Sequence, residues 1–236
     1  MKINYKKGRL HYLLYKIIFL ISLLAIDSCN YSNQSAKKNT EFENRPNILI
    51  LMSDNQSADH LGCYGDKSVK TPNIDKLAEN GVLFNNAFCS APSCSPARAA
   101  MLSGQDIWRL KQAANLWSSF PKVKVFTGLF EEDGYKVGIE GKGWGPGNYK
   151  ISGWDKNPGG DKFNSFKSFI NKSKKDKPWL YWYSSTEPHR PFRKNGWKNS
   201  KINLDSIFVP PYLPDNIEIR KDIADYYDEI QIFDTQ

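Results

Sequence analysis

The stretch from Ser93 to Arg98, which reads Ser-Cys-Ser-Pro-Ala-Arg, holds residue types that can handle an anion. Cys94 lies just before a predicted helix over 96–102, whose first backbone N–H groups and dipole stabilise negative charge. A thiol at such a place has a lowered pKa, and Arg98, one turn further on, can pair with an anion in a bidentate way. Free cysteines are also commonly buried and inert. The residues alone therefore leave a reactive site and a structural cysteine both open.

Two oxygen-bearing side chains, Asp54 and Asn55, follow a continuous apolar run over 47–52. Such a run predicts a strand buried on both faces, as in a parallel sheet. Hard oxygen ligands at its end suit Ca²⁺ or Mg²⁺. Asp and Asn also favour simple turns, and without further support the turn is the better interpretation.

Strand and helix signals alternate along the chain and predict an α/β fold with a mostly parallel sheet. Ligands bind such sheets at the carboxyl ends of the strands. The expected strands cover 47–52, 82–84, 135–140 and 179–183, and the expected helices cover 72–80, 96–102 and 125–133, with helical spacing also at 163–170 and 219–233. In the helix at 72–80 we expect Ile74, Leu77 and Ala78 to face inward.

The apolar face over 219–233 is followed by neither Gly nor Pro before the last residue, Gln236. Helices usually end with such signals. The pattern predicts a helix whose apolar face needs further protein to cover it.

The segment from Cys94 to Gly104 resembles the signature of the formylglycine-dependent sulfatases, which have the alkaline phosphatase-like fold. That signature is Cys or Ser, any residue, Pro, any residue, Arg, then three residues before Leu-Thr/Ser-Gly, and here it reads Cys-Ser-Pro-Ala-Arg-Ala-Ala-Met-Leu-Ser-Gly. The opening strand with Asp54, the Leu-Gly-x-Tyr-Gly of 61–65 and the Thr-Pro-Asn-Ile-Asp of 71–75 are also similar to the family. The resemblance extends from about Arg45 to the end of the chain.

The resemblance implies a catalytic role for four residues. Cys94 would be oxidised by a maturation enzyme to formylglycine, whose hydrate is the nucleophile that attacks sulfur. Arg98 would fix that hydrate, and Lys142, in Gly-Lys-Gly, would neutralise sulfate charge. His189 would contact the sulfate or assist the leaving group, although a histidine in a proline-rich loop is ordinarily a surface group.

The resemblance also implies one divalent cation, usually Ca²⁺, bound by Asp54, Asn55 and the modified Cys94. Asn55 stands where a second Asp is usual, so the site carries less negative charge. Trp144 stands where a His is common, which removes a proton donor or sulfate contact, and an aromatic there can instead form a sugar-stacking wall. The family takes an Asp, an Asn and often a Lys from a later segment that the 236 residues do not contain. We therefore expect 45–236 to be the N-terminal part of a truncated sulfatase domain.

The segments 187–190 and 209–214 are most similar to the heparan N-sulfatase (N-sulfoglucosamine sulfohydrolase) branch. The first hypothesis is therefore hydrolysis of a sulfuric ester or sulfamate on a sulfated glycan, with N-sulfate ahead of O-sulfate or aryl sulfate. Two alternatives stay open: an inactive fragment, and a lipid-anchored module that binds sulfated glycans without turnover.

Residues 1–29 have a basic start and an apolar run of ten residues, too short to span a bilayer, which predicts a signal peptide. Three residues after the run, Cys29 stands in a sequence similar to a bacterial lipobox, although Asp27 fits that pattern poorly. We expect a lipid anchor at Cys29, with ordinary cleavage or an uncleaved anchor as the alternatives. We also expect a flexible tether over 30–44 and export to the periplasm or cell surface of a bacterium.

The net charge of +8 is partly due to the first 29 residues. The remaining charge suits an anionic ligand, and no basic stripe interleaved with aromatics indicates nucleic acid. If Cys29 and Cys94 are modified, Cys63 and Cys89 are left, and they can form a disulfide outside the cytoplasm.

Overall fold

The computed structural model describes residues 45–236, of which Asn47–Gln236 form one compact unit. The predicted signal peptide, the tether and Cys29 lie outside the described residues. Among the residues that are described, no helix is long and apolar enough to cross a membrane.

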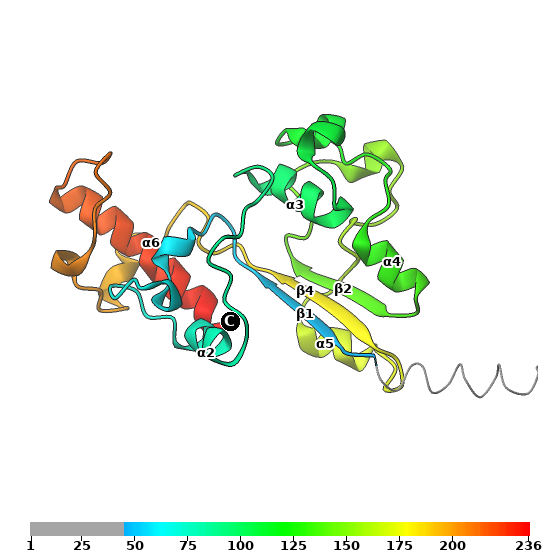
Figure 1. The fold of residues 1–236 in the computed structure, drawn as a ribbon, viewed down its shortest axis with the longest axis horizontal. Coiled ribbons are helices and arrows are strands. Elements are labelled where there is room, and N and C mark those ends of the chain that lie inside the picture. The colour runs from blue at the N-terminus through cyan, green and yellow to red at the C-terminus, as the bar shows by residue number, and fades with distance from the viewer. Residues whose placement is uncertain (1–44) are drawn as a thin grey trace, which may run out of the picture. The chain divides into compact units, whose positions relative to one another are not determined.

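A parallel four-stranded sheet forms the centre of this unit, as Figure 1 shows. The strands in spatial order are β1 (Ile48–Met52), β4 (Trp179–Ser184), β2 (Lys136–Gly141) and β3 (Asp161–Lys162). Each adjacent pair is parallel, with Ile48 opposite Leu180 and Ile139 opposite Lys162. The predicted α/β class with a parallel sheet is confirmed.

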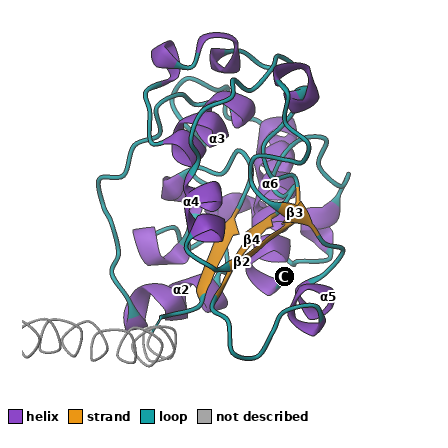
Figure 2. Cartoon of the chain, turned by 90° about the vertical axis from the view of Figure 1, so that its right-hand side faces the viewer, coloured by secondary structure: helices purple, strands orange, loops and turns teal. Residues whose placement is uncertain are grey.

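Helices cover the two faces of the sheet, and Figure 2 shows α4 and α5 on opposite sides of it. On one side α3 (Cys94–Ser103) and α4 (Phe126–Glu132) enclose an apolar core that includes Leu102, Ile139 and Trp182. On the other side α5 (Phe166–Asn171) places Phe169 against Tyr181. Gly138 is required there, because a Cβ on it would lie 2.5 Å from the Phe169 ring.

Short 3-10 turns lie at Ala58–His60, Gly62–Tyr64, Ile107–Arg109, Lys111–Ala114, Tyr149–Ser152, Gly196–Lys198 and Leu204–Ser206.

The long helix α6 (Ile217–Thr235) lies beside α2 (Pro72–Asn80). Its Tyr227 and Ile230 are fully buried against Val69, Ile202 and Ile207. The chain's own segments at 61–69 and 197–207 pack on the middle of this face, so the prediction that further protein must cover it is wrong for that part. Ile219 and Phe233, nearer the two ends of the helix, are only half-buried. Sequence spacing shows that a helix has an apolar face but does not show which distant loop covers it.

The structure corrects three other expectations. The first strand is not buried on both faces: Leu49 and Leu51 are each 51% exposed, because α5 packs on the neighbouring strand and does not reach them. The segment 82–84 is not a strand, and Val82 is 78% exposed. In α2, Leu77 points outward and is 62% exposed.

Candidate active site

The predicted site residues gather where β1, β4 and β2 end. Asp54 follows β1 by two residues, and Lys142 directly follows β2. Backbone hydrogen bonds join the three strand ends: Lys142 N donates to Ser184 O at 3.1 Å, and Asp54 N donates to Glu187 O at 2.9 Å. Gly141 allows this approach, because a Cβ there would lie 2.1 Å from the carbonyl oxygen of Ser184.

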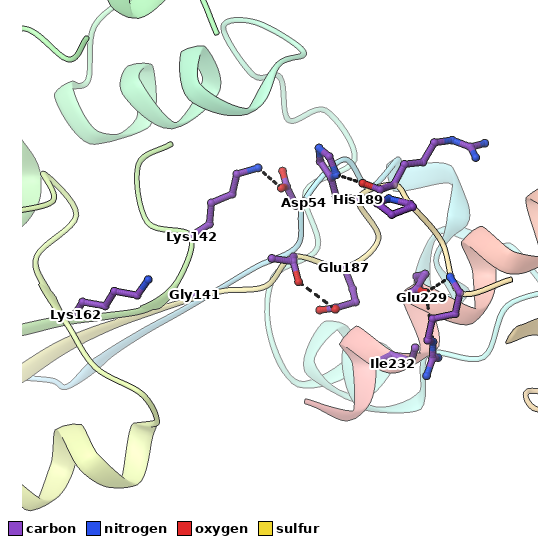
Figure 3. Close-up of a pocket in the computed structure, with 12 residues that line it drawn as sticks. Asp54, Gly141, Lys142, Lys162, Glu187, His189, Glu229 and Ile232 are labelled. Carbon is purple, nitrogen blue, oxygen red and sulfur yellow. Dashed lines mark hydrogen bonds and ion pairs between the residues drawn. The ribbon is translucent and has the colours of Figure 1, made fainter. Parts of the chain in front are cut away.

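The Asp54 carboxylate is the centre of the cluster and is only 4% exposed. Its Oδ2 accepts a hydrogen bond from the ammonium of Lys142, as Figure 3 shows, and its Oδ1 lies 3.6 Å from Arg98 Nη2. A buried carboxylate is costly unless it is paired. Two cations face one carboxylate, so the cluster has a net positive charge that suits an anionic ligand.

Arg98 projects from the second turn of α3 and is 3% exposed. Its Nη1 donates to Gly143 O at 2.9 Å and to the hydroxyl of Ser184, and the guanidinium lies 5.8 Å from the ring centroid of Trp182. Burial lowers the pKa of Arg98, while the charge of Asp54 opposes that shift. Arginine stays charged in proteins, so this side chain is a fixed buried cation.

Cys94 is the first residue of α3, two positions earlier than the predicted helix start. Ser93 precedes it in an extended conformation, with φ −152° and ψ 141°, which places the thiol at the positive end of the helix. The sulfur lies 4.0 Å from Asn55 Oδ1. Asn55 has a left-handed backbone, with φ 64°, and its carbonyl accepts a hydrogen bond from the Tyr226 hydroxyl at 3.1 Å.

His189 completes the cluster. Its backbone N donates to Thr186 O at 2.9 Å, and its Nδ1 is hydrogen-bonded to the Arg190 carbonyl. Because a carbonyl only accepts, Nδ1 carries a proton and Nε2 remains available to another group.

A divalent cation fits part of this arrangement. Ligand atoms of Asp54, Cys94 and His189 lie within 4.8 Å of one another. Asp54 and Asn55 supply the oxygen atoms that Ca²⁺ prefers. Ca²⁺ takes about six to eight oxygens, so these two side chains form only part of a calcium site.

Two hollows meet at Asp54. One, of about 730 Å³, contains Lys142 and His189 and extends to Lys162 on β3. The other, of about 1020 Å³, contains Cys94, Arg98 and the loop before α3. The Asp54 carboxylate thus lies in the wall between the two hollows.

Trp144 does not line either hollow, and the expected sugar-stacking wall is wrong. The side chain is 2% exposed, its Nε1 donates to Ser95 O at 3.1 Å, and its ring meets Phe120 edge-on at 5.2 Å. It instead supports the start of α3. Cys63 and Cys89 are free thiols, so the disulfide considered for them is not formed.

The sequence interpretation missed two residues that support the site. At the end of β4, the Ser184 hydroxyl accepts a hydrogen bond from Arg98. The hydroxyl of Tyr226, on α6, donates to Asn55 O and accepts from Ser57 N. A hydroxyl at a strand end is a weak signal for the first, while the second contact joins positions 171 residues apart and had no signal.

The sheet is parallel, and a cationic cluster and a cysteine lie at its carboxyl edge. This arrangement is typical of a hydrolase that acts on anionic esters. The sulfatase family model matches residues 46–231, and the chain belongs to that family. Human arylsulfatase D is 33% identical over 136 residues, which are 53% of this chain and 22% of that protein. Mouse iduronate 2-sulfatase is 37% identical over 132 residues, which are 53% of this chain and 23% of that protein.

The solved structure of a Bacteroides fragilis sulfatase, yidJ, has the same fold, with a TM-score of 0.64 and 21% identity. That similarity covers 80% of this chain and 56% of the solved one. The chain therefore spans about half the length of that solved structure, and its matches with the two curated relatives span less than a quarter of theirs.

Proposed function

We propose that this chain carries the catalytic centre of a sulfatase that hydrolyses a sulfuric ester or sulfamate on a sulfated glycan. The observation that carries the proposal is the buried cluster of Asp54, Lys142 and Arg98 beside Cys94 at the start of α3. Formylglycine derived from Cys94 would supply the nucleophile, and a bound divalent cation, Ca²⁺ by family resemblance, would offset the charge of the sulfate.

Each side chain has a role that its surroundings support. Lys142 is the most accessible cation of the cluster, 18% exposed, and can attract the sulfate into the hollow of about 730 Å³. Arg98 is held by three acceptors and so keeps a fixed positive charge near position 94. Preorganised charge of this kind stabilises a transition state without reorganisation. His189 presents Nε2 to the same hollow and can exchange a proton with the leaving group.

Asp54 and Asn55 would hold the cation in this proposal. With two oxygen-bearing side chains against the six to eight oxygens that Ca²⁺ takes, we expect residues 45–236 to bind Ca²⁺ weakly. We also expect low turnover until further ligands are supplied. Loss of one preorganised charge-stabilising group costs about a hundredfold to a thousandfold in rate.

The substrate class rests on two lines of support. The heparan N-sulfatase resemblance of 187–190 and 209–214 favours N-sulfated glucosamine, and one relative is named for a sulfated sugar acid, iduronate. Another is named as an arylsulfatase. N-sulfated glucosamine and an aryl sulfate are therefore the two substrates to compare.

The direct test is to express the chain together with a formylglycine-generating enzyme and to analyse the Cys94 peptide by mass spectrometry. We expect an aldehyde at Cys94 and an unmodified thiol at Cys89, which has Ala91 and Ser93 where the motif has Pro and Arg. An unmodified Cys94 under conditions that convert a known sulfatase would refute the proposed chemistry. Turnover with Ca²⁺, abolished by a chelator and by Arg98→Ala, would support it.

Export and lipid attachment at Cys29 belong to the same proposal and rest on residues 1–29 alone. Mass spectrometry of the mature protein from a bacterial host should find Cys29 as a lipidated N-terminus. A mature chain that begins elsewhere and carries no lipid would contradict it.

A further inference from the structure

The hollow that contains Lys142 and His189 continues along the edge of the sheet to Lys162, the last residue of β3. Figure 3 shows Lys162 projecting from its own strand toward Gly141 and the Lys142 loop. Lys162 is exposed, and its side chain makes no hydrogen bond or ion pair with any residue of 45–236. It is therefore a cation without a counter-charge at one end of a pocket whose other end is the candidate sulfate site.

The other charged groups of this hollow are already paired. Arg190 forms an ion pair with Asp222, and Arg193 pairs with Asp228 and Glu229. The carboxylate of Glu187 accepts hydrogen bonds from Ser185, Thr186 and Gln236. The acidic groups in the wall thus do not neutralise Lys162.

The strand register sets the separation of the two lysines. Lys162 lies opposite Ile139, and Lys142, which directly follows β2, is three residues after Ile139. Three residues of strand extend about 10 Å, and neighbouring strands are about 4.8 Å apart. The Lys162 backbone is therefore about 11 Å from that of Lys142. The Lys142 ammonium is held against Asp54, so a ligand that spans the hollow can present a separate negative group to each lysine. A second negative group on the same ligand would fit between them.

We propose that Lys162 binds a second anionic group, a carboxylate or a sulfate, on the sugar that neighbours the one holding the scissile sulfate. The inference rests on the proposed function and narrows its substrate to glycans with at least two negative groups. Lys162 is a specificity residue in this proposal and takes no part in bond breaking.

Binding to the full chain with its unmodified thiol tests the proposal without turnover. The ligands are a disaccharide of N-sulfated glucosamine and a uronic acid, and the same disaccharide with the carboxyl reduced to an alcohol. Calorimetry or NMR titration gives each dissociation constant for the wild type, Lys162→Gln, Lys142→Gln and the control Lys167→Gln. Lys167 is an exposed lysine on α5 outside the hollow.

For the acidic disaccharide, Lys162→Gln should raise the dissociation constant about fivefold to tenfold, the effect of one ion pair at a partly exposed place. The reduced disaccharide should bind the wild type and Lys162→Gln equally, and Lys167→Gln should change neither. If Lys162→Gln raises the dissociation constants of both disaccharides equally, or changes neither, the proposal that Lys162 binds a second anionic group is wrong.

The proposed function has its own readout in the same titrations. Lys142→Gln should weaken both disaccharides, because both carry the sulfate. If Lys142→Gln leaves both unchanged, the sulfate site is wrong whatever Lys162→Gln does. If the wild type binds neither ligand at millimolar concentration, both proposals fall.

Discussion

Replacement of Arg98 by Met tests the buried cluster, because it removes one charge and keeps much of the side-chain volume. The change leaves the Asp54 carboxylate, 4% exposed, with Lys142 as its remaining cation. It also removes the donor that serves Gly143 O and the Ser184 hydroxyl. The surrounding wall of Trp182 and α3 leaves little room for water to replace that donor.

The expected loss of stability follows from these contacts. Breaking a buried ion pair by removing one partner costs about 3–5 kcal/mol. Because Lys142 still pairs with Asp54, we expect the lower end, about 3 kcal/mol. With a urea dependence of about 2–3 kcal/mol per molar, the unfolding midpoint should fall by roughly 1–1.5 M.

The assay is urea unfolding followed by circular dichroism, with a chelator present to keep divalent cations from the site. Arg109→Met is the matched control, since Arg109 is exposed and its guanidinium lies over the Trp108 ring without a hydrogen bond or ion pair to the described residues. The change should alter stability by less than about 0.5 kcal/mol. The double variant Asp54→Asn with Arg98→Met should lose at least about 1 kcal/mol less than the sum of the single variants. A loss no larger than the Arg109 control, or additive single changes, would refute the account of the cluster.

Three further predictions use the same unfolding assay. Tyr226→Phe removes the hydroxyl that holds Asn55 O and Ser57 N and should cost about 1 kcal/mol, whereas Tyr212→Phe, at an exposed position, should cost nothing measurable. Gly138→Ala should destabilise by about 1–3 kcal/mol through its collision with Phe169, while Gly128→Ala, inside α4 with only an ordinary contact at 3.6 Å, should stabilise by up to about 1 kcal/mol; the same sign for both would contradict the packing described. For Glu187, burial raises the carboxyl pKa, but hydrogen bonds from Ser185 and Gln236 outweigh it and hold the pKa below the ordinary value of 4.5. That contribution is present above pH 4.5 and is lost as the pH falls through the lowered value, so Glu187→Gln should flatten the acid side of the stability profile, and an unchanged profile would count against these bonds.

Much of the geometry of the candidate site could be predicted from short segments of sequence. Asp54 after an apolar run, and Cys94 with Arg98 one helical turn later, are local patterns, and the structure brings them together as the parallel sheet requires. The fold class could be predicted for the same reason, since strand and helix periodicities are local.

Long-range packing could not be predicted. Trp144 was expected at a sugar-binding wall, but it is buried because Phe120 and the start of α3 enclose it. Leu49 and Leu51 were expected to be buried, but they are half exposed. The prediction failed because an apolar run does not tell which face of the strand a helix covers. The contact of Tyr226 with Asn55 depends on how α6 packs, which no local pattern specifies.

The parallel pairing of β1 with β4 also determines when β1 can pair during synthesis of the chain. The start of β1 must wait for residues 132 positions later, because the side chain of Asn47 accepts a hydrogen bond from Trp179 N when the two strands pair. At about 5–20 residues per second, a ribosome takes roughly 7–26 s to make that stretch. During this interval Cys94 and its neighbours have left the ribosome tunnel well before Ser184 arrives to receive Arg98. In the folded chain Ser95 and Arg98, which follow Cys94 in α3, are buried, so other proteins have their best access to this segment in those seconds.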